Sequence, residues 1–482
     1  MTIVSLSALA WATRSFPVKV KSLMVGVCLL AWLPEPACTQ PLGPANGQSI
    51  SLGQATARLD GPWRFHAGDD PAWAAPGFDD SQWERVDLTA SAGSHDADVG
   101  LSGYVDGWGG RGHRGMSGYG WYRLHLQIDS SAGQALAIAG PPAVDSAYQI
   151  FWDGEILGGI GDLRGASVRV FSIKPRLFPL PHTNSTLGND VDVLAVRVWM
   201  GPWDLADPKG GGIRIAPTLG TSDAVRAIYQ SEWIETLRGY VVEVAEAFAF
   251  ACLCLALWLL AQFELDRHKY RWLYAALVLT AACRLNQAIF FWGQFESVPT
   301  FVLVSLGFLY PLCLAAWTMG WARVSGVQNT LWVRAFASLT FIYLAAALSQ
   351  HAMLLCSTSS PILTKLNAVI SSCRLCYLAA TIWILFKLSR SKCRSRWFLC
   401  SLIVLVSIGQ FARELSQIGV PNIWFPFGTG VSRAQFAYAL FLVVAAAFLC
   451  VRLGVVAETC IRQSALCHRD AADNLADKGI TS

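Results

Sequence analysis

Residues 435–455 read QFAYALFLVVAAAFLCVRLGV, an apolar run that only Arg452 interrupts with a charge. An α-helix needs about 20 such residues to cross the hydrocarbon core of a bilayer. This run is the last of seven, and the other six occupy residues 241–262, 271–292, 298–321, 331–348, 362–388 and 397–415. The sequence therefore predicts a membrane protein with a seven-helix transmembrane bundle over residues 239–457.

The composition of the whole chain agrees with a membrane protein. Of its 482 residues, 54% are hydrophobic and only 15% are charged, and the formal net charge is +4. A net charge this small does not indicate a nucleic-acid partner. The partner that the composition predicts is membrane lipid.

The first 40 residues have the pattern of a secretory signal peptide. Three basic residues precede an apolar run over residues 23–33, which is too short to span a membrane. Lipid attachment at Cys38 is the alternative, but Glu35 stands where such signals prefer a small or aliphatic residue. The chain between Cys38 and Cys252 contains no cysteine, so the exported region needs no disulfide bonds.

Residues 41–220 are predicted to form an extracytoplasmic all-β domain. In residues 122–128, YRLHLQI, every second side chain is apolar, which is the pattern of a half-buried strand. Residues 148–152 and 194–198 repeat the pattern, and Asp153-Gly154 supplies the chemistry of a hairpin turn after the first of them. Short strands separated by Gly, Pro and Asp are typical of an antiparallel jelly-roll sandwich.

An aromatic and acidic string lies near the start of this domain. Residues 63–73 read WRFHAGDDPAW, and residues 78–83 read FDDSQW. Together with residues 120–123, GWYR, and the Asp153-Gly154 turn, they resemble the sugar-binding jelly roll of glycoside hydrolase family 2, which has a galactose-binding-like fold. The resemblance implies a carbohydrate ligand.

The same aromatic rings have a simpler interpretation, since rings at this spacing would fill the core of a sandwich. The sequence favours that structural role for Trp63, Phe65, Trp73, Phe78 and Trp83, with Asp79 and Asp80 as turn or capping residues.

The glycine-rich segment 104–119 is the predicted ligand contact, because its composition is too polar for a core segment. Glycine lets a backbone come close to a ligand, and Trp and Arg side chains can stack on it or pair with it. The candidate residues are Trp108, Arg111, His113 and Arg114; a surface loop without function is the alternative. No two positioned carboxylates such as glycoside hydrolysis requires are identified, and no metal or cofactor site is predicted.

The distribution of Lys and Arg predicts the orientation of the protein. Basic residues cluster after the first, third and fifth apolar runs, and the alternate loops contain few. Because basic loops stay in the cytoplasm, we expect the β domain outside the cytoplasmic membrane and the tail, residues 458–482, inside. A helix-compatible connector over residues 221–238 joins the β domain to the first span.

Ionisable residues within the apolar runs form a second candidate site. Charges at such depth are costly, so they either pair or function. Glu243 and Glu246 lie on one face of the first helix, and Glu246 is predicted to pair with Arg284 of the second. The full predicted cluster is Glu243, Glu246, Arg284, Arg374, Arg413 and Glu414. Static packing pairs without a role in signalling are the alternative.

An exported jelly roll followed by seven spans resembles the bacterial seven-transmembrane receptors with diverse intracellular signalling modules. The string over residues 68–73, GDDPAW, and the order of the parts carry the resemblance. It implies a receptor that senses an extracytoplasmic small molecule or glycan. The effector module of that family has no counterpart in residues 458–482.

The predicted function is therefore a signal-transducing receptor, not itself an enzyme, that passes its signal to a separate cytoplasmic signalling protein. One alternative is a membrane-tethered carbohydrate-binding protein without signalling. Another is the truncated remnant of a sensor kinase, phosphatase or cyclase.

Overall fold

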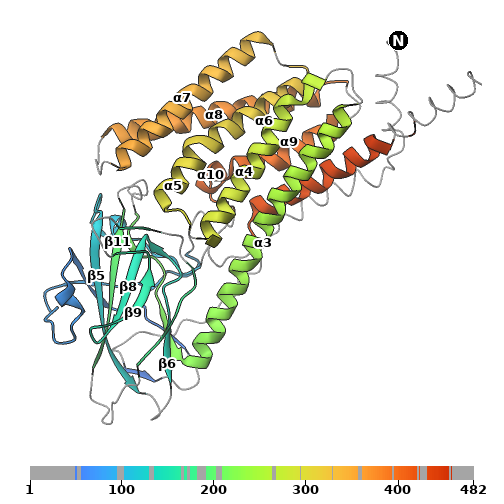
Figure 1. The fold of residues 1–482 in the computed structure, drawn as a ribbon. Helices are drawn as coiled ribbons and strands as arrows, with labels where there is room; N and C mark the ends of the chain where they lie inside the picture. Colours follow the sequence, from blue (N-terminus) through green and yellow to red (C-terminus); the bar gives the residue numbers. More distant parts are fainter. Residues whose placement is uncertain are drawn as a thin grey trace, which may run out of the picture.

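The computed structural model describes residues 49–51, 56–94, 102–129, 135–163, 168–170, 174–181, 191–201, 209–262, 267–293, 295–327, 329–355, 361–392, 396–420, 423, 431–454 and 458. The predicted signal peptide and nearly all of the predicted tail lie outside these residues. The described part of the chain consists of a β region followed by a helical region, as Figure 1 shows.

The β region contains two main sheets, which we call the sandwich. The larger sheet has the order β4 (Glu84–Val86), β3 (Trp63–Ala67), β5 (Gly118–Asp129), β11 (Asp192–Met200), β8 (Ala147–Trp152) and β9 (Glu155–Ile160). The smaller has the order β10 (Leu177–Pro179), β6 (Leu136–Ala139), β13 (Thr218–Thr221) and β2 (Ala57–Arg58). A separate pair joins β12 (Gly212–Ile213) to β7 (Val144–Asp145). Among the described strands, only β1 (Ser49–Ser51) pairs in parallel, with β5.

The predicted hairpin turn is confirmed between β8 and β9. Asp153 has a φ of 47° and Gly154 a φ of 87°. Two successive residues with positive φ match the tight turn whose twist suits antiparallel strands, and Asp and Gly are residues that adopt this conformation. The carboxylate of Asp153 also accepts a hydrogen bond from the backbone N–H of Val193 at 2.7 Å, which ties the turn to β11.

The core of the sandwich lies between its two main sheets. Tyr122 and Leu124 of β5 are buried there, because alternate side chains of a strand share one face. Ile138 of β6 packs against the same core from the smaller sheet. The core role predicted for the aromatic string is confirmed for Trp63 and Phe65, which are 0% and 2% exposed.

The opposite face of the larger sheet carries a second, smaller aromatic cluster. Trp121 of β5 is buried on this face, and Trp73, Phe78 and Trp83 pack over it. Trp73 belongs to a short 3-10 helix, η1 (Pro71–Ala74), that begins with a proline and is capped by the carboxylate of Asp70. The aromatic string therefore has a structural role on both faces of the sheet.

Arg123 of β5 fixes the segment that covers this face. Its guanidinium is fully buried, and its Nε donates to Asp80 Oδ2 at 2.7 Å. Its Nη1 donates to the carbonyl oxygens of Ala75, at 3.0 Å, and of Trp73. His125 Nε2 lies 2.8 Å from Asp80 Oδ2. One arginine thus links the central strand to residues on both sides of the turn that follows η1.

The two aspartates of this segment have different roles. Asp79 is exposed and accepts a hydrogen bond from the backbone N–H of Ser81 at 3.0 Å, so its predicted turn role is confirmed. Asp80 also begins a turn, since its carbonyl oxygen accepts a hydrogen bond from the backbone N–H of Trp83 at 3.0 Å. Its side chain has a further role that the sequence did not predict, as the counter-charge of the buried guanidinium of Arg123. Burial alone would raise the pKa of Asp80, but its hydrogen bonds with Arg123 and His125 lower the pKa overall.

The helical region begins with α3 (Ser222–Ala261), a continuous helix of 40 residues that contains both the predicted connector and the first predicted span. The helices that follow are η4 (Arg267–Tyr270), α4 (Arg271–Gly293), α5 (Val298–Val302), the π-helix η5 (Leu303–Leu309), α6 (Tyr310–Val324), α7 (Thr330–Leu355), α8 (Pro361–Ser389), α9 (Arg396–Gln410), α10 (Ala412–Gln417) and a final helix, Arg433–Gly454. We call α3 from Gly239 onward, together with α4 to the final helix, the bundle.

Within the described residues, six helices are long and apolar enough to cross a membrane. They are Ser222–Ala261, Arg271–Phe290, Val298–Val324, Thr330–Leu355, Ile362–Ser389 and Arg433–Gly454. The single span predicted over residues 397–415 is instead two helices, α9 of 15 residues and α10 of six.

The break between α9 and α10 has a tertiary cause. Phe411, at the break, has φ −107° and ψ 27°, outside the helical range. The carbonyl oxygen of Gln410 accepts a hydrogen bond from Arg374 Nη2 of α8 at 3.0 Å. A buried guanidinium thus bonds the backbone at the point where the helix bends.

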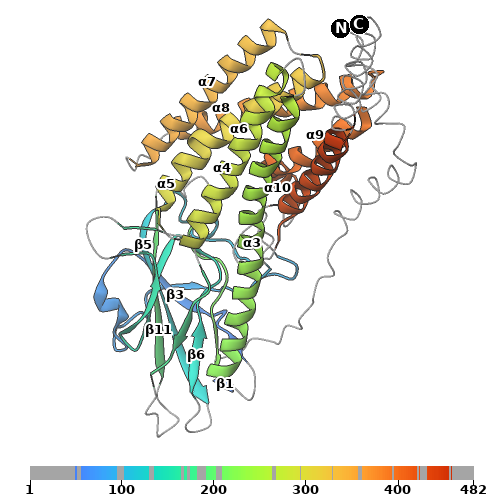
Figure 2. The ribbon, with the colours of Figure 1, turned by 45° about the vertical axis from the view of Figure 1, so that its right-hand side comes forward.

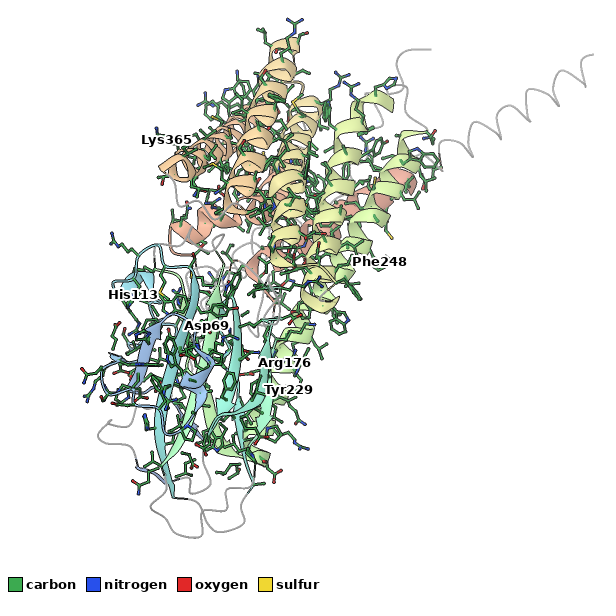
Figure 3. The ribbon with its side chains drawn as sticks, turned by 60° about the vertical axis from the view of Figure 1, so that its left-hand side comes forward. Asp69, His113, Arg176, Tyr229, Phe248 and Lys365 are labelled. Atoms are coloured by element: carbon green, nitrogen blue, oxygen red, sulfur yellow. The ribbon has the colours of Figure 1, made fainter. Side chains whose placement is uncertain are left out.

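The sandwich and the bundle are joined through α3. Figures 1 and 2 show this helix beside β6 at its lower end and among the other helices at its upper end. Val225 of α3 is buried against Ala137 and Ala139 of β6. In Figure 3, Tyr229 marks the part of α3 beside the sheets and Phe248 the part within the bundle. A single continuous helix therefore connects the smaller sheet to the bundle.

The buried ion pair of the sandwich gives the first prediction. Replacing Asp80 by Asn leaves the Arg123 guanidinium buried without a counter-charge, so we expect a loss of about 3–5 kcal/mol in the free energy of unfolding. The contribution of Asp80 is present above its ordinary pKa of 3.8 and is lost as the pH falls below that value, because its folded pKa is lowered.

Thermal unfolding of the purified chain at pH 7 and at lower pH measures this effect. The matched control is Asp79→Asn, which removes the exposed neighbouring carboxylate. Equal losses for the two variants would contradict the role assigned to Asp80.

Candidate functional site

The glycine-rich segment of the sandwich does not present Trp108 to a ligand. The indole is 1% exposed and belongs to the sandwich core, where its Nε1 donates to the hydroxyl of Tyr122 at 2.7 Å. Phe65 packs against the same ring at a centroid distance of 5.8 Å. The expectation that this segment is too polar for the core is wrong for Trp108, which cannot stack on a ligand in this structure.

The other three residues of the predicted loop site lie nearer the surface. Arg111 ends a 3-10 helix, η2 (Gly109–Arg111), and donates from Nε to the carbonyl oxygen of Asp106 at 2.8 Å and from Nη2 to that of Asp87 at 2.7 Å. His113 Nε2 lies 2.8 Å from Glu84 Oε2, and Arg114 is exposed. The first two residues pin the loop to the sandwich, which leaves Arg114 as the member turned to solvent.

The structure brings together a polar surface group on the larger sheet that sequence reasoning missed. Arg197 of β11 donates from Nε to Asp69 Oδ1 at 2.7 Å and from Nη1 to Gln149 Oε1 at 3.0 Å. Trp121 Nε1 donates to the same Asp69 oxygen at 3.1 Å, and the guanidinium lies over the ring of Tyr119 at 4.3 Å. Arg197 and Asp69 are 16% and 28% exposed at their side chains. We call these residues the Arg197 surface.

The register of the strands explains the Arg197 surface. Arg197 pairs with Trp121 of β5 and with Gln149 of β8, so the three side chains leave the same face of the sheet. Asp69 lies 128 positions earlier in the chain, where no spacing rule links it to Arg197. The alternation of the apolar residues Leu194, Val196 and Val198 in β11 was the available signal, and it places Arg197 on the face opposite the core.

The predicted pair of the bundle, Glu246 and Arg284, is confirmed as an ion pair. Arg284 Nε donates to Glu246 Oε2 at 2.9 Å, and Arg284 Nη2 donates to Glu243 Oε1 at 2.5 Å. Gln287 Oε1 accepts from Arg284 Nη1 at 3.3 Å, and the final helix contributes Gln435, whose Nε2 donates to Glu243 Oε1 at 3.0 Å. We call these five residues the Arg284 network. Its part in signalling stays a prediction.

Of the remaining residues of the predicted cluster, Arg374 and Glu414 form an ion pair, whereas Arg413 lies apart from it. Arg374 of α8 donates to the carboxylate of Glu414 on α10 from Nε at 2.5 Å and from Nη2 at 2.7 Å. This two-point contact joins α8 to α10. Arg413 is exposed and lies outside the cluster, so its predicted membership is wrong. Neighbouring residues of a helix project about 100° apart, and the bend at Phe411 turns Glu414 rather than Arg413 toward Arg374.

A cavity of about 40 Å³ connects the Arg284 network with Arg374. Its charged lining consists of Glu243, Arg284 and Arg374. Uncharged polar side chains also line it, namely Thr280, Gln287, Tyr310, Gln410, Ser432 and Tyr438, together with two cysteines and several apolar residues. This volume is room for a few water molecules and is far below that of a drug-sized ligand site. We call it the bundle cavity.

Close helix packing shapes the bundle cavity. A Cβ added at Gly409 of α9 would lie 2.1 Å from the ring of Tyr438, so this glycine allows the final helix to approach. The Tyr438 ring in turn lies 5.1 Å from the guanidinium carbon of Arg284. On the other side, Tyr310 follows directly after η5, and such π-helical segments occur often at functional sites.

Comparison with known proteins gives a weak and partial likeness. No family model matches the chain. Over 183 residues, 37% of this chain, it is 29% identical to the beta-galactosidase BoGH2A of Bacteroides ovatus, and it spans about a fifth of that protein, 20%. The chain is therefore weakly similar, over part of its length, to a glycoside hydrolase.

Solved structures give similar partial matches. A beta-glucuronidase of Bacteroides uniformis covers 34% of this chain at 21% identity with a TM-score of 0.24, the chain covering 17% of it. A glycosyl hydrolase family 2 member of Bacteroides cellulosilyticus covers 34% at 22% identity with a TM-score of 0.23, the chain covering 20% of it.

The burial of Trp108 gives the second prediction. Replacing Trp108 by Ala removes a large core side chain, so we expect a loss of about 3–5 kcal/mol in the free energy of unfolding. The exposed Arg114→Ala serves as the matched control in the same loop and should change stability by less than about 0.5 kcal/mol. Chemical unfolding of both variants measures the difference. Unchanged stability of the Trp108 variant would contradict its place in the core.

Proposed function

We propose that the protein is a signal-transducing receptor of a bacterial cytoplasmic membrane. The observation that carries the proposal is the continuity of α3, which binds the smaller sheet at one end and the Arg284 network at the other. Val225 is buried in the sheet contact, and Glu243 and Glu246 are buried in the bundle. A displacement of the sheet would move these two carboxylates with it, because a helix transmits motion along its axis.

A second contact between sandwich and bundle supports the same proposal. Lys174 Nζ donates to the carbonyl oxygen of Trp292 at the end of α4, at 2.5 Å. The backbone N–H of Val298, at the start of α5, donates to the carbonyl oxygen of Val170 at 3.1 Å. Val298 also packs against Ala147 of β8. Besides its contact with the first part of α3, the sandwich therefore contacts α4 and α5 of the bundle directly.

The ligand of this receptor is proposed to be a carbohydrate-like small molecule bound outside the membrane. The Arg197 surface offers a carboxylate, a guanidinium, an amide and an aromatic ring, which suit the hydroxyl groups and the apolar face of a sugar. The weak similarity to a beta-galactosidase and the family 2 resemblance of the string over residues 63–83 favour the same ligand class.

The proposed topology follows the basic loops, with the sandwich outside and the tail in the cytoplasm, and with α9 and α10 together completing a seventh crossing. The proposed output is contact with a separate cytoplasmic signalling protein. We propose that this chain binds its sugar without hydrolysing it, because no two carboxylates of its sequence stand out as a catalytic pair. A glycosidase requires two carboxylates that face the bond to be cleaved.

The third prediction tests binding and transmission together. A sugar that binds the purified chain should, at about a hundred times its dissociation constant, stabilise it by about 2.7 kcal/mol in a thermal unfolding screen. The same sugar should change hydrogen–deuterium exchange in the final helix, because Gln435 of that helix bonds Glu243 of α3. Binding without any change of exchange in the bundle would favour a tethered capture protein, and no binding by any sugar would reject the carbohydrate ligand.

Two exposed residues of α3 allow transmission to be separated from binding. Gln230 and Ser231 lie between the sheet contact and the bundle. The double variant Gln230→Gly, Ser231→Gly softens the helix at a cost of about 1 kcal/mol per residue, whereas the matched Ala variant keeps it stiff. We expect the Gly variant to bind the sugar as the wild type does and to lose the exchange response, while the Ala variant retains both.

A further inference from the structure

The charges around the bundle cavity do not balance. Three carboxylates, those of Glu243, Glu246 and Glu414, surround two guanidiniums, those of Arg284 and Arg374. Both arginines donate hydrogen bonds to these carboxylates. When all three carboxyl groups are ionised, the five side chains together carry one excess negative charge. A net charge away from water is costly and attracts a compensating cation.

The hydrogen bonds locate the excess charge. Glu243 is 0% exposed, and its Oε1 accepts from both Arg284 and Gln435. Its second oxygen, Oε2, and Oε1 of Glu246 are buried without a hydrogen-bond partner among the residues that the structure describes. Glu243 lines the bundle cavity, so an unpartnered carboxylate belongs to a space that admits water-sized particles.

We propose that the bundle cavity binds one small monovalent cation at Glu243, taken up either as a proton on the carboxylate or as Na⁺ beside it. The proposal does not depend on the sandwich binding a sugar. The cavity offers neutral oxygens from Thr280, Tyr310 and Ser432, which are ligands that a hard cation accepts.

The composition of the site favours a monovalent over a divalent metal ion. Within the described chain, no group of three or more His, Cys, Asp or Glu side chains is placed to hold a metal ion. The one excess negative charge of this set is compensated by one positive charge. The volume of about 40 Å³ excludes larger organic cations but admits Na⁺ with water.

The helices that pack around Glu243 contribute charged or titratable side chains near its carboxylate. The same helix bears Glu246, and α4 bears Arg284 and Cys283. The thiol of Cys313 and the hydroxyl of Tyr310 face the cavity from α6, Arg374 from α8 and Tyr438 from the final helix. Of these groups only Arg284 and Arg374 are cationic at neutral pH, and both donate to carboxylates.

Cation binding would tie α3 to the helices that surround the cavity. The carboxylate of Glu243 already joins α3 to α4 through Arg284 and to the final helix through Gln435. A cation at Oε2 adds a further link from the same side chain toward α6 or toward Ser432. The occupied state is therefore expected to be the more stable arrangement of the bundle.

Thermal unfolding of the purified full chain in detergent tests the proposal. One arm replaces choline chloride by NaCl at constant ionic strength and pH 8, with KCl as a second comparison. The other arm lowers the pH in choline chloride. We expect the midpoint to rise by about 3 °C in at least one arm. A response to NaCl identifies Na⁺ as the occupant, and a response only to pH identifies the proton.

Two variants assign the effect to Glu243. Glu243→Gln retains the shape of the side chain and removes the charge, so it should abolish the response. Glu235→Gln is the matched control, since Glu235 lies on the same helix, is 36% exposed at its side chain and pairs with Arg238. We expect this control to respond as the wild type does.

A wild-type measurement keeps the test valid if Glu243→Gln does not fold. Difference infrared spectroscopy should show a carboxylic acid carbonyl band that grows as the pH falls if the proton is the occupant, or a shifted carboxylate band on adding NaCl if Na⁺ is. The absence of a response in both arms and both spectra, or an unchanged response in Glu243→Gln, would overturn the proposal.

Discussion

A guanidinium buried among apolar helices has to be surrounded by acceptors, and Arg284 shows what this requirement imposes on the bundle. Its three nitrogens donate to Glu246, Gln287 and Glu243. Glu243 is in turn bonded to Gln435, so α3, α4 and the final helix meet at one polar point. Apolar packing is non-directional, whereas these bonds fix the rotation of each helix about its axis.

The same device recurs elsewhere in the described part of the molecule. In the bundle, Arg374 joins α8 to α10 through Glu414 and bonds the backbone where the helix bends. In the sandwich, Arg123 holds the segment around Asp80 on the larger sheet. In each case removal of one partner leaves a buried charge, so these arginines specify positions more than they add stability.

The sequence predicted the features that depend on a local residue pattern or on the free-energy cost of placing a charge in an apolar helix. The apolar runs, the alternating strands and the Asp153-Gly154 turn follow from local pattern, and the Glu246–Arg284 pair follows from the cost of a charge in an apolar helix. The burial of Trp108 was missed because glycines and polar residues surround it in the sequence, while its partner Tyr122 lies on strand β5. The exclusion of Arg413 and the contact of Arg197 with Asp69 depend on tertiary geometry that no spacing encodes.

The central claim is that the sandwich and the bundle form one coupled unit through α3, and coupling between two sites is reciprocal. Hydrogen–deuterium exchange in β6 and β13 of an Arg284→Gln variant tests it most directly, with the exposed Arg413→Gln as control. If the claim holds, loosening the bundle raises exchange in these two strands, and the control leaves them unchanged. Strands that exchange as in the wild type while the bundle itself exchanges faster would contradict it.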